Sequence, residues 1–121
     1  MAMDEFYILK TIEGVRVVRF RQSHILDAMT IEHMASGIKE LIDSEQAGRF
    51  VLDFESVTYL SSSALGMLIG LQRRVVQRKA RMKLSGINPE VMEVFHITKL
   101  DTVFDIYKDE SAAVEAFRKN A

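Results

Sequence analysis

The spacing of apolar residues changes several times along the chain, and each change predicts a new element. FYILKTIEG (residues 6–14) and VRVVRF (residues 15–20) are rich in β-branched and aromatic residues, which favour strands. Glu13 and Gly14 separate the two apolar runs, and Gly14 suits a tight turn. We therefore expect the chain to begin with two antiparallel strands.

Helical spacing begins at Thr30. Apolar residues recur every three or four positions from Ile31 to Ile42, and polar residues and a glycine between positions 43 and 48 end the run. A second helix is expected from about Ser63 to Lys79, where apolar residues form one stripe and arginines close the run with cations that suit a helix C-terminus. Both runs predict amphipathic helices that bury one face.

The last third of the chain repeats this alternation with shorter elements. Pro89 suits the first turn of a short third helix that reaches toward Leu100, and a last helix is expected over residues 109–119. Short apolar runs between the helices predict buried strands, and these runs are residues 49–54, 81–87 and 103–107. The predicted order of elements is ββαβαβαβα.

This order predicts an α/β fold. Strands that alternate with helices favour right-handed crossovers and parallel pairing, so we expect a mixed, mostly parallel sheet that opens with a β-hairpin and has helices packed on it. A chain of 121 residues is long enough for one compact domain and short for two ordinary ones. We therefore interpret residues 1–121 as a single domain.

Composition narrows the range of functions. The chain has 16 basic and 17 acidic residues, so its formal charge of −1 favours neither nucleic acid nor an anionic membrane. It has no cysteine, which excludes disulfides, thiol nucleophiles and cysteine metal sites. No apolar run approaches the roughly 20 residues that span a bilayer, and the acidic start of the chain is unlike a signal peptide. We expect a cytoplasmic protein without cofactor or metal.

Three consecutive serines, Ser61 to Ser63, lie between the strand expected at residues 49–54 and the second helix. One of them could cap the helix, because a serine hydroxyl accepts a hydrogen bond from a free backbone N–H there, worth about 1 kcal/mol. One of them could instead be phosphorylated, because a phosphate at a helix N-terminus meets unpaired N–H donors. The residues alone leave both hypotheses open.

Three stretches of the sequence resemble one known family. FVLDFESVTYLSSSALGMLIGL (residues 50–71) is similar to the core segment of STAS domains, the family of bacterial anti-sigma factor antagonists, in which a strand leads through an Asp-Ser-(Ser/Thr)-Gly-Leu-Gly turn into a helix. Residues 25–42 resemble the family's first-helix region, and residues 81–107 resemble its later strand and helix. The family's fold is also a mixed sheet with helices.

The resemblance assigns a role to each serine. It places the phosphorylated hydroxyl on Ser62 and the Ser/Thr that follows it on Ser63. We expect phosphorylation of Ser62 and regard Ser61 and Ser63 as weaker candidates. Two positions depart from the family pattern, because Ser61 stands where the family usually has aspartate and Ala64 where it usually has glycine. Losing the carboxylate removes a charge that could position the target serine or the metal and phosphates of a kinase. The extra serine also makes the target ambiguous.

The second helix is predicted to offer a partner surface near Ser62. Small residues are spaced one turn apart along it, and two apolar residues lie away from its main stripe. The predicted partner-binding residues are Ser61, Ser63, Ala64, Gly66, Met67 and Leu71. The alternative is that Met67 and Leu71 simply pack in the core, as scattered apolar residues of an α/β helix usually do.

The function implied by the resemblance is partner switching. The unmodified domain would capture an anti-sigma factor of the serine kinase type and so free a sigma factor, and phosphorylation of Ser62 by that kinase would reverse the capture. A phosphatase would be a further partner. The alternative is a STAS scaffold that is never phosphorylated and binds a partner in a transporter, sensor or stress-signalling assembly.

An enzyme is the remaining class, and we expect none. Asp53 and Glu55 could share a face as a metal or acid/base pair, but a strand-end carboxylate more often bonds turn amides. The histidines at positions 24, 33 and 96 lack the HExxH spacing and are expected at the surface or at helix ends. The chain also lacks a glycine-rich phosphate loop and a nucleophile–base pair.

Overall fold

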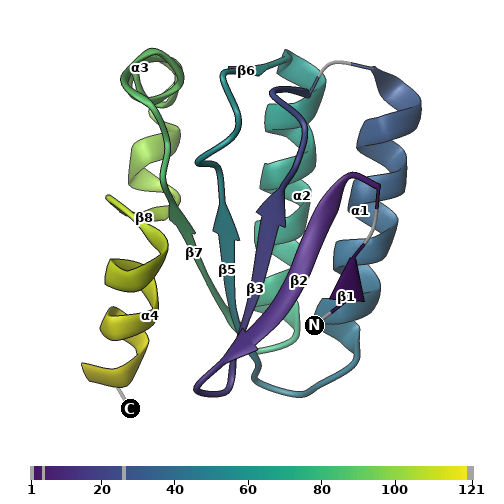
Figure 1. The fold of residues 1–121 in the computed structure, drawn as a ribbon, viewed down its shortest axis with the longest axis vertical. Helices are drawn as coiled ribbons and strands as arrows, with labels where there is room; N and C mark the ends of the chain where they lie inside the picture. The colour runs from purple at the N-terminus through teal and green to yellow at the C-terminus, as the bar shows by residue number, and fades with distance from the viewer. Residues whose placement is uncertain (1, 4, 26, 120–121) are drawn as a thin grey trace.

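The computed structural model describes residues 2–3, 5–25 and 27–119, which fold as the sequence predicts, with three short strands added (Figure 1). The strands are β1 (Ala2–Met3), β2 (Tyr7–Ile12), β3 (Val15–Phe20), β4 (His24–Ile25), β5 (Arg49–Asp53), β6 (Tyr59–Leu60), β7 (Arg81–Ser85) and β8 (Asp105–Tyr107). The helices are α1 (Ala28–Asp43), α2 (Ser62–Gln77), α3 (Pro89–Ile97), the 3-10 helix η1 (Leu100–Thr102) and α4 (Glu110–Lys119).

The main sheet has the strand order β1-β2-β3-β5-β7-β8. Strand β2 pairs antiparallel with β1 and β3, whereas β3, β5, β7 and β8 pair in parallel. The predicted hairpin joins β2 to β3 through Glu13 and Gly14, whose φ angles of 52° and 81° give the left-handed backbone that such tight turns require. The α/β class and the mixed, mostly parallel sheet are therefore confirmed.

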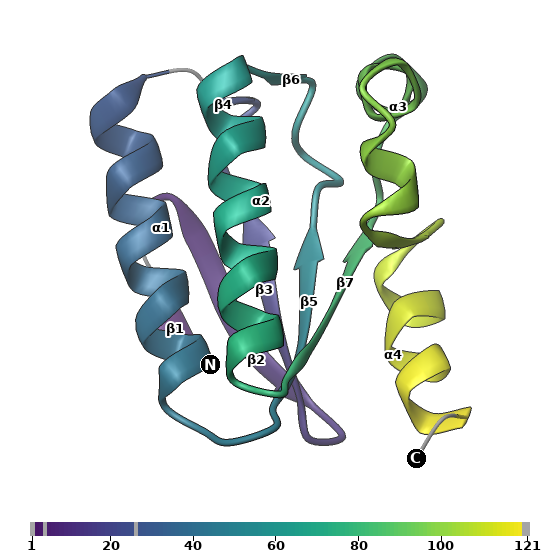
Figure 2. The same ribbon diagram turned by 180° about the vertical axis from the view of Figure 1, so that it is seen from behind.

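The helices cover the two faces of this sheet unequally. Helices α1 and α2 lie side by side over one face, and α4 lies on the other (Figures 1 and 2). Side chains along β5 alternate accordingly, because Phe50 and Leu52 join the larger apolar cluster whereas Val51 packs with Phe117 of α4. The face that α4 covers carries the smaller cluster, which leaves room there for polar side chains.

Two element boundaries differ from the prediction, at the start of α1 and at the start of the last strand. Helix α1 begins at Ala28, before the expected Thr30, because Asp27 caps it by accepting from the Thr30 N–H at 2.7 Å and from its hydroxyl at 2.8 Å. These hydrogen bonds hold the pKa of Asp27 below its usual value. The last strand is shorter than residues 103–107, since η1 precedes it and Phe104 turns into the core.

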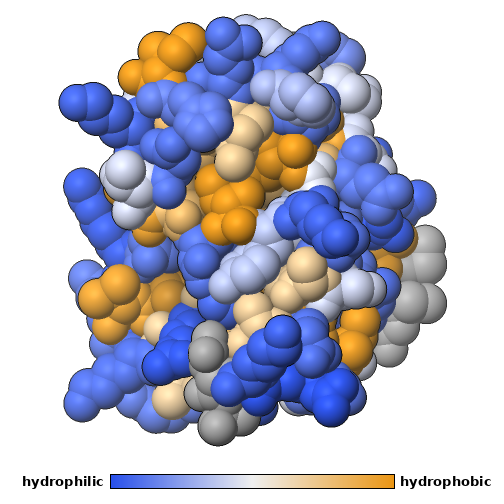
Figure 3. Space-filling model, turned by 90° about the vertical axis from the view of Figure 1, so that its left-hand side faces the viewer, coloured by the Kyte–Doolittle hydropathy of each residue, from blue (hydrophilic) through white to orange (hydrophobic). Residues whose placement is uncertain are grey.

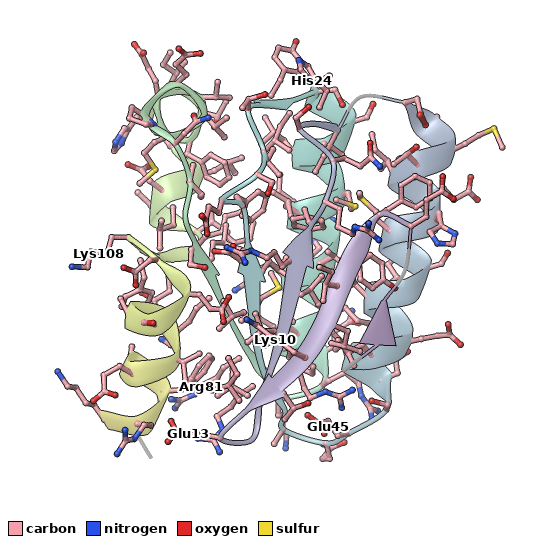
Figure 4. The ribbon with its side chains drawn as sticks, in the orientation of Figure 1. Lys10, Glu13, His24, Glu45, Arg81 and Lys108 are labelled. Carbon is pink, nitrogen blue, oxygen red and sulfur yellow. The ribbon has the colours of Figure 1, made fainter. Side chains whose placement is uncertain are left out.

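The strands β4 and β6 were not expected, and they form a separate parallel pair. Two-residue strands carry no periodicity of their own, so the sequence indicated only loops there. His24, predicted in a loop, lies in β4 at the end of the molecule where α2 begins (Figure 4). Among the helices of the described residues, none has the length and apolar character needed to cross a membrane.

Candidate functional site at the start of helix α2

The chain between β5 and α2 is fixed by backbone hydrogen bonds. The Val57 N–H donates to the Phe54 carbonyl at 2.9 Å, and the Thr58 N–H donates to the Ser23 carbonyl at 2.7 Å. Strand β6 then pairs with β4, and the Ser61 N–H donates to the Ile25 carbonyl at 3.1 Å. Phe54 and Val57 are buried beneath this segment. The three serines are therefore held in place at the carboxyl ends of the parallel strands, where α/β proteins usually meet ligands and partners.

The three serines have different environments. Ser61 is the N-cap of α2, since its backbone is extended and its hydroxyl accepts from the Ala64 N–H at 3.1 Å. Ser62 is the first residue of the helix, and both Ser62 and Ser63 are exposed. Within the described part of the chain, no side-chain hydrogen bond occupies the Ser62 or Ser63 hydroxyl. The cap and an accessible hydroxyl are thus on different residues.

The predicted partner surface on α2 needs correction. Ala64 and Leu71 are fully buried and Met67 is only 8% exposed, because all three lie on the helix face that packs into the larger core cluster. They cannot form an open surface, and the alternative that Met67 and Leu71 belong to the core is right. Ser61 is half-buried. Ser63 and Gly66 are exposed, so they stay available for the predicted role.

A groove that the sequence did not indicate lies between β6 and α3. It has a volume of about 230 Å³, and its lining residues are Thr58, Tyr59, Leu60, Glu90, Val91 and Val94. Tyr59 is 52% exposed and Val94 38% exposed, although one is aromatic and the other wholly apolar. Tyr59 lies two residues before Ser61, so the groove is next to the serines along the chain. The mixture of glutamates and apolar residues at helical spacing in 90–97 is the signal that could have revealed it.

The carboxylates Asp53 and Glu55 do not form a metal site. Asp53 is buried, accepts from the Ser85 hydroxyl at 2.7 Å and pairs with Arg19 Nε at 3.1 Å, while Glu55 pairs with another nitrogen of Arg19. Burial alone would lower the pKa of Arg19, but the charges of the two carboxylates outweigh it and raise that pKa. No cluster of three or more potential metal ligands occurs among the described residues. These carboxylates are structural ion-pair partners.

The histidines also have structural neighbours. The His24 ring stacks on the Tyr59 ring with centroids 6.2 Å apart, and its Nδ1 lies 2.9 Å from the Ser23 hydroxyl. His96 at the end of α3 pairs with Asp101 at 2.5 Å. His33 on α1 meets the edge of the Phe6 ring. His24 is therefore the histidine that lies beside the candidate site.

Comparisons with known proteins agree with this architecture. The model of the STAS domain family matches residues 7–113, so the chain belongs to the STAS domain family. An anti-sigma F factor antagonist from Paenibacillus polymyxa is 28% identical over 101 residues, which are 84% of this chain and 85% of that protein. The resemblance seen in the three sequence stretches is thereby confirmed at the level of the family.

Solved structures share the fold. An anti-sigma-factor antagonist (STAS) domain protein from Planctomyces limnophilus superposes with a TM-score of 0.81 at 22% identity, covering 91% of this chain and 95% of that one. The Bacillus cell fate determinant SpoIIAA in its phosphorylated form superposes with a TM-score of 0.67 at 19% identity, covering 91% and 98%. At these identities the likeness concerns the fold alone.

Proposed function

We propose that this chain is an anti-sigma factor antagonist that binds an anti-sigma factor of the serine kinase type and releases it when Ser62 is phosphorylated. The relative from Paenibacillus polymyxa, itself an anti-sigma F factor antagonist, supports the first half of this proposal. The observation that carries the second half is the exposed Ser62 hydroxyl at the first position of α2, beside a neighbour that already caps the helix.

The fold can accept a phosphate at Ser62. The first turn of α2 contains no acidic residue, so a phosphate there would meet no like charge within the turn. It would lie near the free N–H groups and the positive end of the helix dipole. Because Ser61 supplies the cap, modification of Ser62 leaves the cap intact. A phosphorylated SpoIIAA with the same fold is consistent with such a state.

Ser62 is a better target than its neighbours. Phosphorylation of Ser61 would engage the oxygen that accepts from the Ala64 N–H, and Ser61 is half-buried, so a kinase would reach it less easily. Ser63 is exposed and stays a second candidate. A phosphate adds a charge of about −2 to this surface, and a loss of ~3 kcal/mol of binding free energy would weaken a complex more than a hundredfold. That change is large enough for a switch.

The proposed switch also needs a compartment and an enzyme that removes the phosphate. The protein would act in the cytoplasm, without catalysis of its own, and a phosphatase would restore the unmodified Ser62. The second candidate function is a STAS scaffold that is never phosphorylated. Ser61 favours this candidate, because the carboxylate that the family usually places beside the target serine is absent.

The test begins with the protein purified from its native cells under several growth conditions. Mass spectrometry across residues 59–68 should find phosphate on Ser62 with an occupancy that changes between conditions. Full coverage of this segment without phosphate in any condition would overturn the switch and favour the scaffold.

Binding supplies the second half of the test. The wild-type chain should retain a kinase from the same cells that phosphorylates Ser62 with ATP. Ser62→Asp should weaken that binding at least tenfold and Ser62→Ala should preserve it. Ser111→Asp is the matched control, because Ser111 is also an exposed serine in the first turn of a helix, on α4. A kinase that binds Ser62→Asp as tightly as Ser111→Asp would contradict the proposal.

A further inference from the structure

Helix α3 presents an unusual face to solvent. Glu90, Glu93, Val94 and Ile97 follow the spacing i, i+3, i+4, i+7 and therefore share one side of the helix. Ile97 is 75% exposed and Val94 38% exposed, and the two glutamates are exposed as well. Figure 3, which faces the edge of the molecule that carries α3, β8 and α4, shows apolar patches separated by polar side chains. Core packing does not explain apolar residues at these positions.

The groove beside this face has the size of a side-chain pocket. Its floor consists of Leu60 and Val91, which are at most 9% exposed, and its rim includes Tyr59 and Val94. The volume of about 230 Å³ is below the roughly 300 Å³ at which pockets for small molecules begin. An apolar side chain of a protein partner is therefore a better occupant than a free metabolite.

The rim of the groove is held in place before any partner arrives. The Tyr59 ring stacks on His24, whose Nδ1 lies within hydrogen-bonding distance of the Ser23 hydroxyl. Strands β4 and β6 pair directly through His24 and Tyr59. An exposed tyrosine that is already ordered loses little conformational entropy on binding, and tyrosine is common among the residues that dominate interfaces.

Charge selects the kind of partner. Glu90 lines the groove, and Glu93 lies three residues further along the same face of α3. Helix α3 contains neither lysine nor arginine. Both carboxylates lack a salt bridge among the described residues. A partner segment with lysine or arginine beside an apolar residue would complement this surface, and like charges would be disfavoured.

We propose that the groove between β6 and α3 is the docking site for the kinase-type partner, where it receives an apolar side chain flanked by lysine or arginine. This inference rests on the proposed function and adds a second contact to Ser62. The groove contributes affinity before phosphorylation, whereas Ser62 determines release. The kinase must bind the unmodified chain in order to phosphorylate it, and the groove supplies a contact that does not use the target hydroxyl.

The test measures phosphorylation of Ser62 by the purified kinase that the wild-type chain retains. Val94→Asp should raise KM at least fivefold and leave kcat within twofold, because it removes docking and not chemistry. Val76→Asp is the matched control, since Val76 is an exposed helical valine on α2, outside the groove, and it should leave KM unchanged. Circular dichroism and thermal melting check that both variants fold.

Charge reversal gives a second, independent readout. The double variant Glu90→Lys/Glu93→Lys should weaken kinase binding at least tenfold at low salt and abolish most of its salt dependence. The double variant Glu32→Lys/Glu40→Lys is the control, because both glutamates are exposed on α1 and make the same change in net charge. It should retain the wild-type salt dependence.

The outcomes separate the two proposals. If the kinase binds and phosphorylates Ser62 but the groove variants behave like their controls, the docking site is wrong and the proposed function stands. If no kinase binds or Ser62 is never modified, the proposed function fails and the docking site fails with it. If sedimentation shows that the wild-type chain self-associates and that only the groove variants abolish this, a second copy occupies the groove, which also overturns the inference.

Discussion

Polar side chains lie in the middle of the sheet and at the start of α2, and the two groups differ in how their hydrogen bonds are made. In the sheet, Arg19, Asp53, Ser85 and Tyr107 are register partners on four neighbouring strands. Asp53 and Ser85 are almost completely buried and bond to each other. At the start of α2, by contrast, the Ser62 hydroxyl is exposed and has no side-chain partner among the described residues.

A second polar group on the same face of the sheet lies two residues earlier along β7, and it is also paired. Lys83 is 6% exposed, pairs with Asp105, and lies 3.3 Å from the Tyr107 hydroxyl. Its ammonium group also lies 4.7 Å from the centre of the Phe117 ring. On the same face, Lys10 of β2 pairs with Glu110 of α4 at 2.7 Å. Polar groups on this face are therefore matched to one another.

The difference suggests that the polar groups of the sheet contribute to stability, whereas the free hydroxyl at the start of α2 serves function. A buried polar group must have a partner, because an unsatisfied one costs about 1–3 kcal/mol. Substitutions of the buried polar residues in the sheet should therefore lower the free energy of unfolding. A free hydroxyl on the surface can be modified or removed with little effect on folding. Changes at Ser62 should therefore alter the affinity for a partner and leave the free energy of unfolding nearly unchanged.

The largest effect is expected for Asp53→Ala. The substitution leaves the buried Ser85 hydroxyl without its acceptor and separates Arg19 from its buried carboxylate. We expect the free energy of unfolding to fall by about 3 kcal/mol, measured by urea denaturation with circular dichroism. Glu55→Ala is the control, because Glu55 is 68% exposed and its pairing with Arg19 should be worth less than about 1 kcal/mol.

A double-mutant cycle with Ser85→Ala sharpens this result. If the two side chains depend on each other, the double variant should be less destabilised than the sum of the single variants, by about 1 kcal/mol or more. Additive effects would mean that the Asp53–Ser85 bond contributes little, and that the sheet rows are not the stabilising network described above.

The second effect concerns Gly86, which follows β7. Gly86 has a φ of +68°, and a Cβ built there would lie 2.8 Å from Asp53 Oδ1 and 3.1 Å from the Glu55 backbone nitrogen. Gly86→Ala should therefore cost about 2 kcal/mol, through backbone strain and displacement of the buried carboxylate. The measurement is again urea denaturation.

Gly66→Ala is the matched control for Gly86→Ala. A Cβ at Gly66 would meet no atom within 4 Å, and alanine is the better helix former, so we expect a gain of about 0.5–1 kcal/mol. Equal effects of the two substitutions would show that crowding at Asp53 is unimportant.

These cases show why the sequence predicted the fold better than the site. Helical spacing predicted all four α-helices, and short runs of apolar and β-branched residues predicted the five longer strands of the main sheet, because burial shapes both the pattern and the structure. The pairing of Asp53 with Ser85 joins residues 32 positions apart, and no local pattern indicates it. The sequence favoured turn amides over a metal as the partners of Asp53 and Glu55, and it could not indicate Arg19 and Ser85, with which the structure pairs them.

The site itself was only half predictable. The three serines were recognised, and capping by one of them followed from local chemistry, but the residues could not decide which one. The structure assigns the cap to Ser61 because the β4–β6 pair fixes where the helix begins, and such short strands have no signature of their own. Met67 and Leu71 were predicted at the surface because the sequence does not show that α1 packs beside α2. That contact widens the buried face of α2 around the helix and includes both residues.

The third effect tests the division of roles between the serines. Ser61→Ala removes the acceptor of the Ala64 N–H and should lower the free energy of unfolding by about 1 kcal/mol. Ser62→Ala removes a free hydroxyl and should change it by less than about 0.5 kcal/mol. Urea denaturation of the two variants side by side is the measurement, and a larger effect for Ser62→Ala would contradict the assignment of the cap.

The smallest effect is a pH dependence that comes from Lys83. Burial would lower the pKa of Lys83, but its hydrogen bonds to Asp105 and Tyr107 outweigh burial and raise that pKa. A pKa that is raised by folding means that the native state holds this proton more tightly than the unfolded chain does. The resulting stability is fully present below the ordinary lysine pKa of about 10.4 and is lost as the pH rises through the folded value.

Comparison with Lys83→Met isolates this contribution, because all other lysines titrate in both proteins. Methionine keeps an apolar chain of similar length over Phe117, and Asp105 is exposed enough to stay solvated without its partner. Urea midpoints at pH 7, 9, 10 and 11 should show the wild type losing stability relative to Lys83→Met only above about pH 10. A difference in urea midpoint that stays constant across this range would mean that the Lys83 charge adds nothing to stability. The lysine would then stabilise the sheet only through the packing of its aliphatic chain.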